Sequence, residues 1–152
     1  MGRERSCLKP APSFNYPADL VGWMRCSHCE KCCRDTEMEL CETDIARLER
    51  KGYERDDFVR RGADGIPRLR NAGEYCFFYD HESRRCREYS RRPLGCVIYP
   101  VNMWPDGEVV VDELCPEASS IGREELDSKV RRLRKLLDTI ALETTTHNRR
   151  AK

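Results

Sequence analysis

The sequence predicts a small single α+β domain over residues 1–152, stabilised by bound metal and built from short helices, a small antiparallel sheet and a long C-terminal helix. Three observations predict it. The chain has ten cysteines among 152 residues, several short β-prone runs bounded by turn residues, and one long apolar stripe near its C-terminus. A chain of this length fits one domain. We expect a cysteine-cluster core over about 23–118 and an amphipathic helix over about 122–144.

The balance of charge argues against a strongly polyanionic partner. Charged residues make up 36% of the chain, yet they nearly cancel to a net charge of +1. No RNA- or DNA-binding motif accompanies the arginines of residues 84–92, so we expect no nucleic-acid partner. Aromatic residues are only 8% of the chain, which limits the apolar area that can offset conformational entropy. Metal bound by cysteines would supply additional stability.

The sequence favours a cytoplasmic protein that does not enter a membrane. No segment approaches the roughly 18 consecutive apolar residues that a membrane-spanning helix needs. The opening run M-G-R-E-R-S-C-L-K-P has basic residues without the apolar stretch of a signal peptide. Thiols stay reduced in the cytoplasm, which leaves the cysteines free to bind metal.

Residues 7–25 predict an extended lead-in that packs on the core. Prolines at positions 10, 12 and 17 disfavour a helix there. Aromatic residues lie between and after them, and we interpret these side chains as packing residues. We expect Trp23 to shield the following cysteines from solvent.

The next stretch, C-S-H-C-E-K-C-C, is the strongest motif in the chain. It places four thiols in eight residues, at Cys26, Cys29, Cys32 and Cys33. A CxxC turn brings two sulfurs to one ion, and the following xxC adds a third with the same local geometry. A disulfide between the adjacent Cys32 and Cys33 would be strained, so metal is favoured over disulfides. His28 is a weaker candidate ligand, because a residue inside a CxxC turn usually points away from the ion.

Two short helices are expected after the cluster. In the first, Thr43 caps the N-terminus, apolar residues including Leu48 face one side, and Gly52 ends the helix. The second spans residues 54–61 and buries Phe58.

Short strands and turns carry the remaining cysteines. A strand is expected over residues 66–70, and the β-prone run C-F-F-Y from Cys76 should return through a turn at residues 80–81 to Cys86. The sequence Pro-Leu-Gly at residues 93–95 predicts a further turn.

A second hairpin is expected near the end of the core. A turn at residues 106–107 precedes the valine-rich strand 108–112. Its partner is either residues 97–99 or residues 101–104. Either pairing would bring Cys115 back towards the earlier sulfurs.

The last element is the clearest helix in the chain. Apolar residues recur there at alternating steps of four and three: Leu126, Val130, Leu133, Leu137 and Ile140. We expect this stripe to cover the core of the domain, with homodimerisation through the helix as the alternative. Residues 145–152 should fray.

Residues 25–116 resemble one known family, the YkgJ-type cysteine-cluster proteins. The resemblance combines the CxxCxxCC cluster and Arg34 with C-F-F-Y-D from Cys76, C-R-E-Y from Cys86, R-P-L-G-C ending at Cys96, Tyr99-Pro100 and Cys115-Pro116. The family is described as zinc- or iron-chelating, in part as iron–sulfur proteins, and it includes part of flagellin lysine methylases. The resemblance implies a metal- or cluster-binding domain, and Cys7 and Cys41 are additional to its pattern. We expect Cys41 to be a small buried residue.

The CxxCxxC half also resembles the ligand run of bacterial ferredoxins, in which a distant cysteine followed by proline completes a site. Cys115 and Pro116 fit that part of the pattern. Cys33, however, follows directly on Cys32, and this spacing departs from ferredoxins. A ferredoxin fold is therefore not expected.

Eight cysteines are the expected metal ligands: Cys26, Cys29, Cys32, Cys33, Cys76, Cys86, Cys96 and Cys115. Eight thiols favour two four-sulfur sites or one polynuclear site, holding zinc or iron, with a 4Fe–4S cluster among the options. Which thiols share an ion stays open at this point. We expect Cys32 or Cys33 to reach towards the downstream sulfurs. Nearby cations should offset the negative charge of the thiolates: Arg25, Lys31, Arg34 and Arg92.

These patterns favour a metal-binding protein that transfers electrons or senses redox state. The alternative is a zinc-stabilised module that binds a protein partner without redox activity. No Ser-His-Asp arrangement, HExxH, phosphate-binding glycine loop or GxGxxG is present, and the chain has three histidines. Autonomous catalysis is therefore the weakest interpretation, although a role as a component of an iron–sulfur oxidoreductase stays open.

Overall fold

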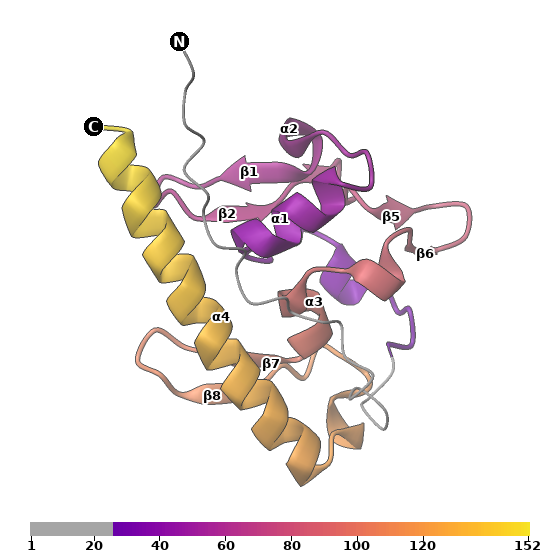
Figure 1. The fold of residues 1–152 in the computed structure, drawn as a ribbon. Coiled ribbons are helices and arrows are strands. Elements are labelled where there is room, and N and C mark those ends of the chain that lie inside the picture. The colour runs from indigo at the N-terminus through magenta and orange to yellow at the C-terminus, as the bar shows by residue number, and fades with distance from the viewer. Residues whose placement is uncertain (1–25) are drawn as a thin grey trace.

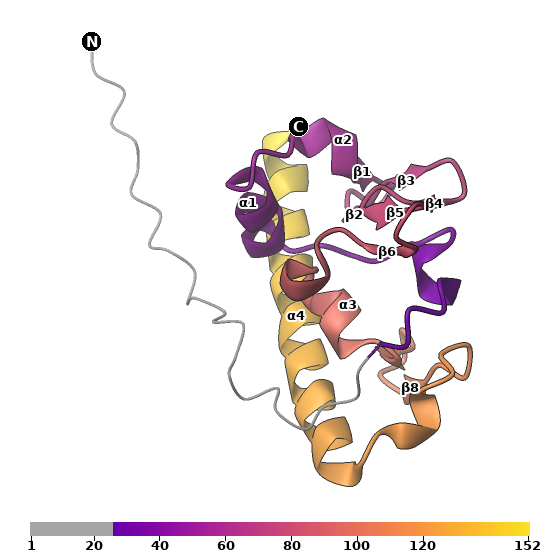
Figure 2. The same cartoon turned by 90° about the vertical axis from the view of Figure 1, so that its right-hand side faces the viewer.

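The structure is a computed structural model in which residues 26–152 are described. The expected lead-in over residues 7–25 and the expected shielding by Trp23 lie outside the described residues. Short helices and antiparallel strand pairs pack beside one long C-terminal helix (Figures 1 and 2). The predicted α+β class is confirmed.

All elements except the last are short. The α-helices of residues 26–152 are α1 (Glu42–Glu49), α2 (Arg55–Phe58), α3 (Leu94–Ile98) and α4 (Arg123–Arg150). The 3-10 turns are η2 (Lys31–Cys33), η3 (Tyr89–Arg91) and η4 (Ala118–Ser120). The strands are β1 (Val59–Arg61), β2 (Pro67–Leu69), β3 (Asn71–Ala72), β4 (Tyr75–Cys76), β5 (Tyr79–Asp80), β6 (Arg85–Cys86), β7 (Val101–Met103) and β8 (Val109–Val111). They pair in sequence as four antiparallel two-stranded sheets, β1–β2, β3–β4, β5–β6 and β7–β8.

Two hydrophobic clusters hold these elements together. The first packs Phe58 and Phe78 with apolar side chains of α1 and β2. The second packs Leu133, Leu136 and Ile140 of α4 against α3 and β7. Both views show α3 lying against α4, whereas the hairpins β3–β4 and β5–β6 lie on the far side of the molecule from α4 (Figure 2).

Helix α1 confirms the first expected helix but not its cap. Its N-cap residue is Cys41, so the prediction for Thr43 is wrong. The Glu42 backbone N–H at the helix N-terminus instead donates to a carboxylate oxygen of Glu143 in α4, at 3.0 Å. Because that carboxylate comes from a distant part of the chain, local sequence could not identify it. Gly52 follows the helix with φ of 101°, as expected for a residue that ends a helix.

The second expected helix is shorter than predicted. Helix α2 ends at Phe58, which is fully buried as expected, and residues 59–61 form β1. Val59 pairs with Leu69 of β2, and the strand predicted over residues 66–70 supplies that partner. Pairing with β2 outweighs the local helical preference, since tertiary contacts commonly override propensity.

Helix α3 was not expected from the sequence. Residues 93–95 begin a helix where a turn was predicted, with Pro93 as the N-cap residue. The alternative strand at residues 97–99 is therefore wrong, and β8 pairs with residues 101–103, the other predicted partner. A Cβ at Gly95 would overlap the sulfur of Met38, so a larger residue here would require the Met38 side chain to move.

Helix α4 continues past the predicted end at residue 144. It reaches Arg150, so the expected fraying of residues 145–150 is wrong. Thr145 and Thr146 donate their hydroxyls to carbonyl oxygens one turn earlier, at 2.9 and 3.0 Å. Asn148 donates to the Asp64 carbonyl oxygen at 3.4 Å, which ties the last turn to the β1–β2 loop. The apolar stripe packs into the domain's own core.

Candidate metal centre

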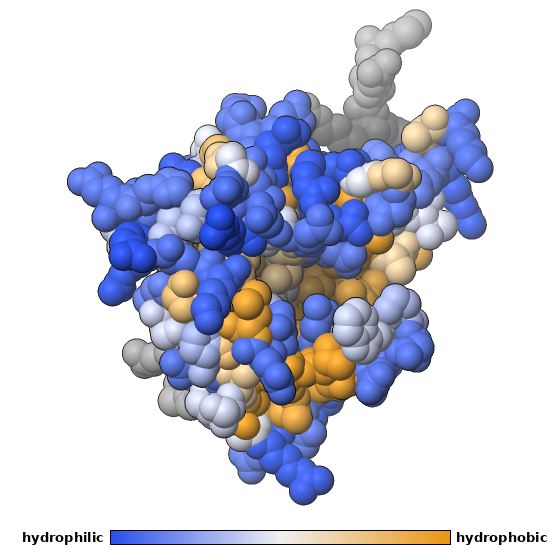
Figure 3. All heavy atoms as spheres, turned by 180° about the vertical axis from the view of Figure 1, so that it is seen from behind, coloured by the Kyte–Doolittle hydropathy of each residue, from blue (hydrophilic) through white to orange (hydrophobic). Residues whose placement is uncertain are grey.

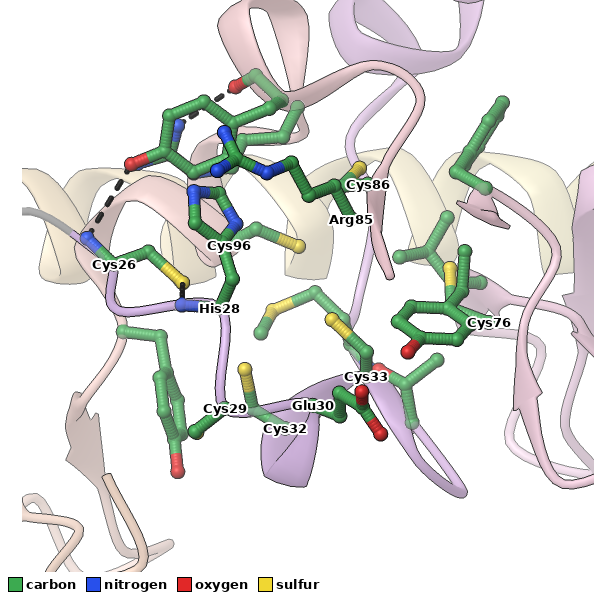
Figure 4. Close-up of a pocket in the computed structure, with 18 of the residues that line it drawn as sticks. Cys26, His28, Cys29, Glu30, Cys32, Cys33, Cys76, Arg85, Cys86 and Cys96 are labelled. Carbon is green, nitrogen blue, oxygen red and sulfur yellow. Dashed lines mark hydrogen bonds between the residues drawn. The ribbon is translucent and has the colours of Figure 1, made fainter. Parts of the chain in front are cut away.

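One cavity brings together all eight cysteines that the sequence predicts as ligands. Its volume is about 90 Å³, several times the roughly 10–15 Å³ that one water molecule requires. The cysteines that line it are Cys26, Cys29, Cys32, Cys33, Cys76, Cys86, Cys96 and Cys115. Figure 4 shows labelled cysteines of the first loop facing those of the downstream segments across this space. Cys41 does not line the cavity and is buried elsewhere, as expected.

The downstream cysteines are placed by four different local structures. Cys76 ends β4, Cys86 ends β6, Cys96 lies in α3, and Cys115 follows β8. The hairpin predicted between Cys76 and Cys86 is present as β5–β6, in which Tyr79 pairs with Cys86. Short strand pairs thus act as the scaffold for this half of the site. The cavity lies between the two hydrophobic clusters, because its walls also include residues of both.

The first loop curls tightly around its own sulfurs. His28 and Glu30 have positive φ angles of 56° and 72°, which non-glycine residues adopt rarely. The Glu30 carbonyl oxygen accepts the Cys33 N–H at 3.1 Å, and the Glu30 carboxylate pairs with Arg84 at 2.6 Å. His28 lines the cavity with its ring 4.9 Å from that of Tyr89. Local strain of this kind persists where the surroundings hold the backbone in place.

A backbone hydrogen bond favours the thiolate at Cys26. The Cys26 sulfur accepts the backbone N–H of His28, two residues further along, at 3.3 Å. The backbone of Phe78, Glu88 and Glu117 likewise acts to lower the pKa of Cys76, Cys86 and Cys115, each two residues earlier in the chain. A backbone N–H directed at sulfur favours the thiolate, which is the form that binds metal.

Burial opposes this effect. It raises the pKa of the Cys76 thiol to about 11 and raises the pKa of Cys26, Cys86 and Cys115 as well. The pKa of Cys96 lies well above its usual value because the residue is deeply buried. Without a metal these thiols are therefore neutral at pH 7, and an ion must displace their protons to bind.

Cys32 lies between the two halves of the site. A charge on its sulfur would raise the pKa of Cys26 in the first loop and of Cys76, Cys96 and Cys115 downstream, which places it near all four. A hydrogen bond with Cys33, followed by burial, raises the pKa of Cys32 itself. That Cys32 or Cys33 connects the two halves through a shared metal stays a prediction.

Arg92 is the cation most closely associated with the thiols. Its guanidinium lies 4.1 Å from the centre of the Tyr89 ring and donates to the Tyr89 carbonyl oxygen at 2.7 Å. It opposes the rise in pKa that burial causes at Cys86 and Cys96.

The other expected cations are arranged differently. Lys31 and Arg34 line a neighbouring groove and not the cavity, and Arg34 pairs with Glu74 at 3.0 Å. Arg25 lies outside the described residues. Arg84 and Arg85 line the cavity in their place, and the sequence analysis did not single them out as partners of the sulfurs.

A buried clamp from α1 holds the segment that carries Arg92 and α3. Asp44 accepts the Leu94 backbone N–H at 3.1 Å and an Arg47 guanidinium N–H at 2.8 Å. Arg47 in turn donates to the carbonyl oxygens of Arg91 and Arg92, both at 3.1 Å. The sequence analysis missed this clamp, because an acidic and a basic residue three positions apart in a helix most often form a surface pair.

The donor set fits zinc or iron, although the donors surround the cavity loosely. Within residues 26–152, no three His, Cys, Asp or Glu side chains are close enough together to hold one ion. Thiols in an apolar cavity are nevertheless the donors that zinc, iron and iron–sulfur clusters require. Binding of one ion by several of these sulfurs would require them to move inward, as is usual where metal binding and local folding are linked.

Comparison with known families agrees with this donor set. Residues 25–124 match the model of the CxxCxxCC family, described as "Putative zinc- or iron-chelating domain". The chain belongs to the CxxCxxCC family. This match confirms the resemblance noted in the sequence and supports metal binding. Neither the curated proteins nor the solved structures contain a significant match to the chain.

The CxxCxxCC match covers the first loop, the downstream cysteines and the start of α4. Every cysteine that lines the cavity is inside it. In the part of the chain that the structure describes, no helix has both the length and the apolar character needed to cross a membrane.

Proposed function

We propose that this CxxCxxCC protein holds zinc or iron in one polynuclear metal–thiolate centre, with the eight cysteines of the cavity as ligands. The observation that carries this proposal is that all eight line a single cavity. Eight thiolates exceed the four that one tetrahedral ion can bind, which favours more than one metal atom. The central place of Cys32 between the two halves also favours a shared centre.

For an iron-loaded centre, we propose electron transfer or redox sensing as the activity. An iron–sulfur cluster, when bound, supplies a one-electron couple. The chain's own residues would set its potential: the backbone N–H of His28 donates to the Cys26 sulfur, apolar walls exclude water, and Arg92 offsets negative charge. We also infer a reducing compartment such as the cytoplasm, since all nine cysteines of residues 26–152 are free thiols.

A zinc-stabilised interaction module is the second candidate. It is favoured by large apolar side chains on the surface near the site, since Trp104 is 57% exposed and Leu114 is 50% exposed. Exposed apolar groups that cluster at a groove are typical of interaction surfaces. In this case the metal would stabilise the fold and take no part in electron transfer.

Anaerobic purification followed by metal analysis and an absorption spectrum tests the proposal. A brown protein with iron and acid-labile sulfide would support the redox centre. A colourless protein with at least one zinc per chain would support the interaction module and overturn the redox role. A chain that retains neither metal under these conditions would contradict both.

A further inference from the structure

The metal cavity opens to solvent beside two arginines. Among the residues that line it, those with exposed side chains are Ser27, Arg84 and Arg85. Ser27 belongs to the first loop, Arg85 begins β6, and Arg84 directly precedes it. A cavity meets solvent where its lining residues are exposed, so the first loop and the β5–β6 hairpin frame its opening. In the chain, this opening adjoins two of the candidate ligands, Cys26 and Cys86.

The charges at the opening do not cancel. The charged side chains that line the cavity are Glu30, Arg84, Arg85 and Arg92. Glu30 pairs with Arg84 at 2.6 Å, and this ion pair has no net charge. Within residues 26–152, no carboxylate lies within ion-pair distance of Arg85 or Arg92. Two guanidinium charges are thus left without an acidic partner.

Tyr89 holds one of these guanidiniums in place. The Arg92 guanidinium lies 4.1 Å from the centre of the Tyr89 ring and donates to the Tyr89 carbonyl oxygen at 2.7 Å. The His28 ring lies 4.9 Å from the same Tyr89 ring, and the Tyr89 hydroxyl accepts the Cys26 N–H at 3.3 Å. Because these contacts connect the first loop to Arg92, its guanidinium has a fixed place near His28.

Arg85 completes this group from the exposed side. Its side chain reaches towards the His28 ring (Figure 4). Burial lowers the pKa of His28, and the positive charges of Arg85 and Arg92 lower it further, which places both guanidiniums near this ring. Arg92 also acts on the sulfurs of Cys26 and Cys86, where it opposes the rise in pKa that burial causes. Arg85 is directed at His28 and the solvent, so the charge of the sulfurs does not account for its position.

The neighbouring groove differs in chemistry from this opening. Cys32 and Tyr99 line both the groove and the cavity, and they form the wall between the two hollows. The floor of the groove is formed by apolar side chains of α4, among them Leu133 and Leu136. Figure 3 shows apolar residues gathered in a hollowed face of the molecule, between two blocks of hydrophilic surface. An apolar floor offers no partner to a small anion, whereas the opening offers two guanidiniums.

The two guanidiniums fit a small oxyanion. A guanidinium presents its N–H donors in a rigid planar fork, which binds two oxygens of a carboxylate or phosphate group at once. A ligand with two or more negative charges would engage Arg85 and Arg92 together. Such a ligand would lie beside the sulfurs at the opening without replacing any of them.

We propose that Arg85 and Arg92 form a binding site for a small oxyanion with carboxylate or phosphate groups, at the opening of the metal cavity beside His28. The site is additional to the metal centre. A chain that held no metal would contradict the function proposed above, yet it would still carry both arginines and allow this site to be tested. An oxyanion that itself binds metal would be drawn to the opening and would exchange metal with the cysteines faster than an uncharged molecule does.

Titration of the full-length chain as purified with citrate and with inorganic phosphate, at low salt, tests the site. At least one probe should bind saturably, and the probe that binds identifies the preferred group. Arg85→Gln should weaken this binding by roughly tenfold or more, because a charge-assisted bidentate contact is lost. The matched control is Arg131→Gln, which removes the same charge from an exposed position of α4 that lines neither hollow. Its affinity should stay within about twofold of the wild type. No saturable binding, or equal weakening in the two variants, would indicate an adventitious ion only and overturn the proposal.

Metal release to two chelators tests the site independently of stability. EDTA is a carboxylate anion, whereas phenanthroline is uncharged, and both bind zinc and iron. Release is measured where its rate rises with chelator concentration. Arg85→Gln should lower the ratio of the EDTA rate to the phenanthroline rate by roughly threefold or more, while Arg131→Gln should preserve this ratio. A change in metal affinity alters both rates and leaves their ratio unaffected. An unchanged ratio in the Arg85→Gln chain would overturn the proposal.

Discussion

At the scale of single residues, the cysteines differ in role although they are chemically identical. Cys41 is as buried as any ligand, yet it faces Asp44, which accepts its S–H at 3.5 Å, outside the cavity. Cys32 lies near sulfurs from both halves of the site. Position in the fold, and not burial alone, thus separates a candidate ligand from a packing residue.

We therefore expect Cys32→Ser to lower the number of metal atoms per chain and Cys41→Ser to leave it unchanged. The first substitution removes a thiol that we propose both halves of the centre share, whereas the second changes a core residue and lowers stability only. Elemental analysis together with native mass spectrometry gives the count. Full metal content in the Cys32→Ser chain would remove this residue from the ligand set.

A buried lysine supplies positive charge near the candidate ligand Cys115. Lys129 of α4 has a side chain only 1% exposed; its ammonium pairs with Glu125 at 2.9 Å and donates to the Tyr99 carbonyl oxygen at 3.5 Å. Burial lowers the pKa of Lys129, while the nearby Glu125 and Cys115 favour its charged form. Its positive charge should stabilise a metal-bound thiolate at Cys115.

Lys129→Met should accelerate metal release to a chelator, because it removes the positive charge beside the thiolates. Lys129→Arg keeps a positive charge and should release metal more slowly than Lys129→Met. Equal acceleration in the two variants would indicate a purely structural role for the buried pair. Release rates measured by stopped-flow absorbance separate the two cases.

At the scale of elements, the short helices and strand pairs are held by contacts between distant segments. Helix α3 has only five residues, Leu94–Ile98, too few to be stable alone, and its N-terminus is held by Asp44 of α1. The same clamp holds Arg92 through Arg47. The position of Cys96 therefore depends on α1, although the two are far apart in sequence.

Asp44→Ala should lower the free energy of unfolding by roughly 3–5 kcal/mol, because it removes the buried acceptor at the N-terminus of α3 and leaves the partly buried Arg47 without its carboxylate. Metal should also be held less tightly, since Cys96 loses its support. A suitable control is Glu37→Ala, which breaks the exposed pair with Arg60 and should cost less than about 1 kcal/mol. Urea unfolding of the metal-loaded chains measures the free energy of unfolding of both variants. Equal decreases in the two variants would contradict a special role for the clamp.

At the scale of the whole molecule, metal and fold are expected to depend on each other. The cavity lies between the two hydrophobic clusters, and its cysteines come from segments spread over residues 26–115. An ion that binds several of these sulfurs would cross-link both clusters. Metal removal should therefore lower the melting temperature and loosen much of the domain.

The stability of the metal-free protein and that of the metal-loaded protein should change with pH in opposite directions. Folding raises the pKa of buried thiols, to about 11 for Cys76. In the metal-free protein, the stabilisation from these neutral thiols is complete below the pKa of a thiol in the unfolded chain. It is lost as the pH rises from that value towards about 11. In the loaded protein the thiols are deprotonated, and acid competes with the metal for them. Melting temperatures should thus fall above about pH 8.5 without metal and fall on acidification with metal. Parallel pH profiles would contradict thiolate ligation.

The sequence by itself determined the α+β class and the long helix, and it identified the eight cysteines that we propose as donors. These follow from local patterns, namely thiol spacing, β-prone runs bounded by turns, and an apolar stripe of helical period. Local patterns also predicted two possible partners for the strand at residues 109–111, and the observed partner, residues 101–103, is one of them. They failed at the start of α3, at the end of α2 and at the last turns of α4, where contacts with Asp44, β2 and Asp64 respectively stabilise the observed backbone.

Only the tertiary structure decided how the donors are arranged. It brought all eight cysteines to one cavity and placed Cys32 between the two halves of the site. Arg84 and Arg85 line that cavity, whereas the expected cations Lys31 and Arg34 do not. It also revealed the Asp44–Arg47 clamp and the groove on the other side of the cavity wall. The physical reason is that spacing along the chain constrains only neighbours, whereas the distance between Cys26 and Cys115 is set by packing of the segments between them.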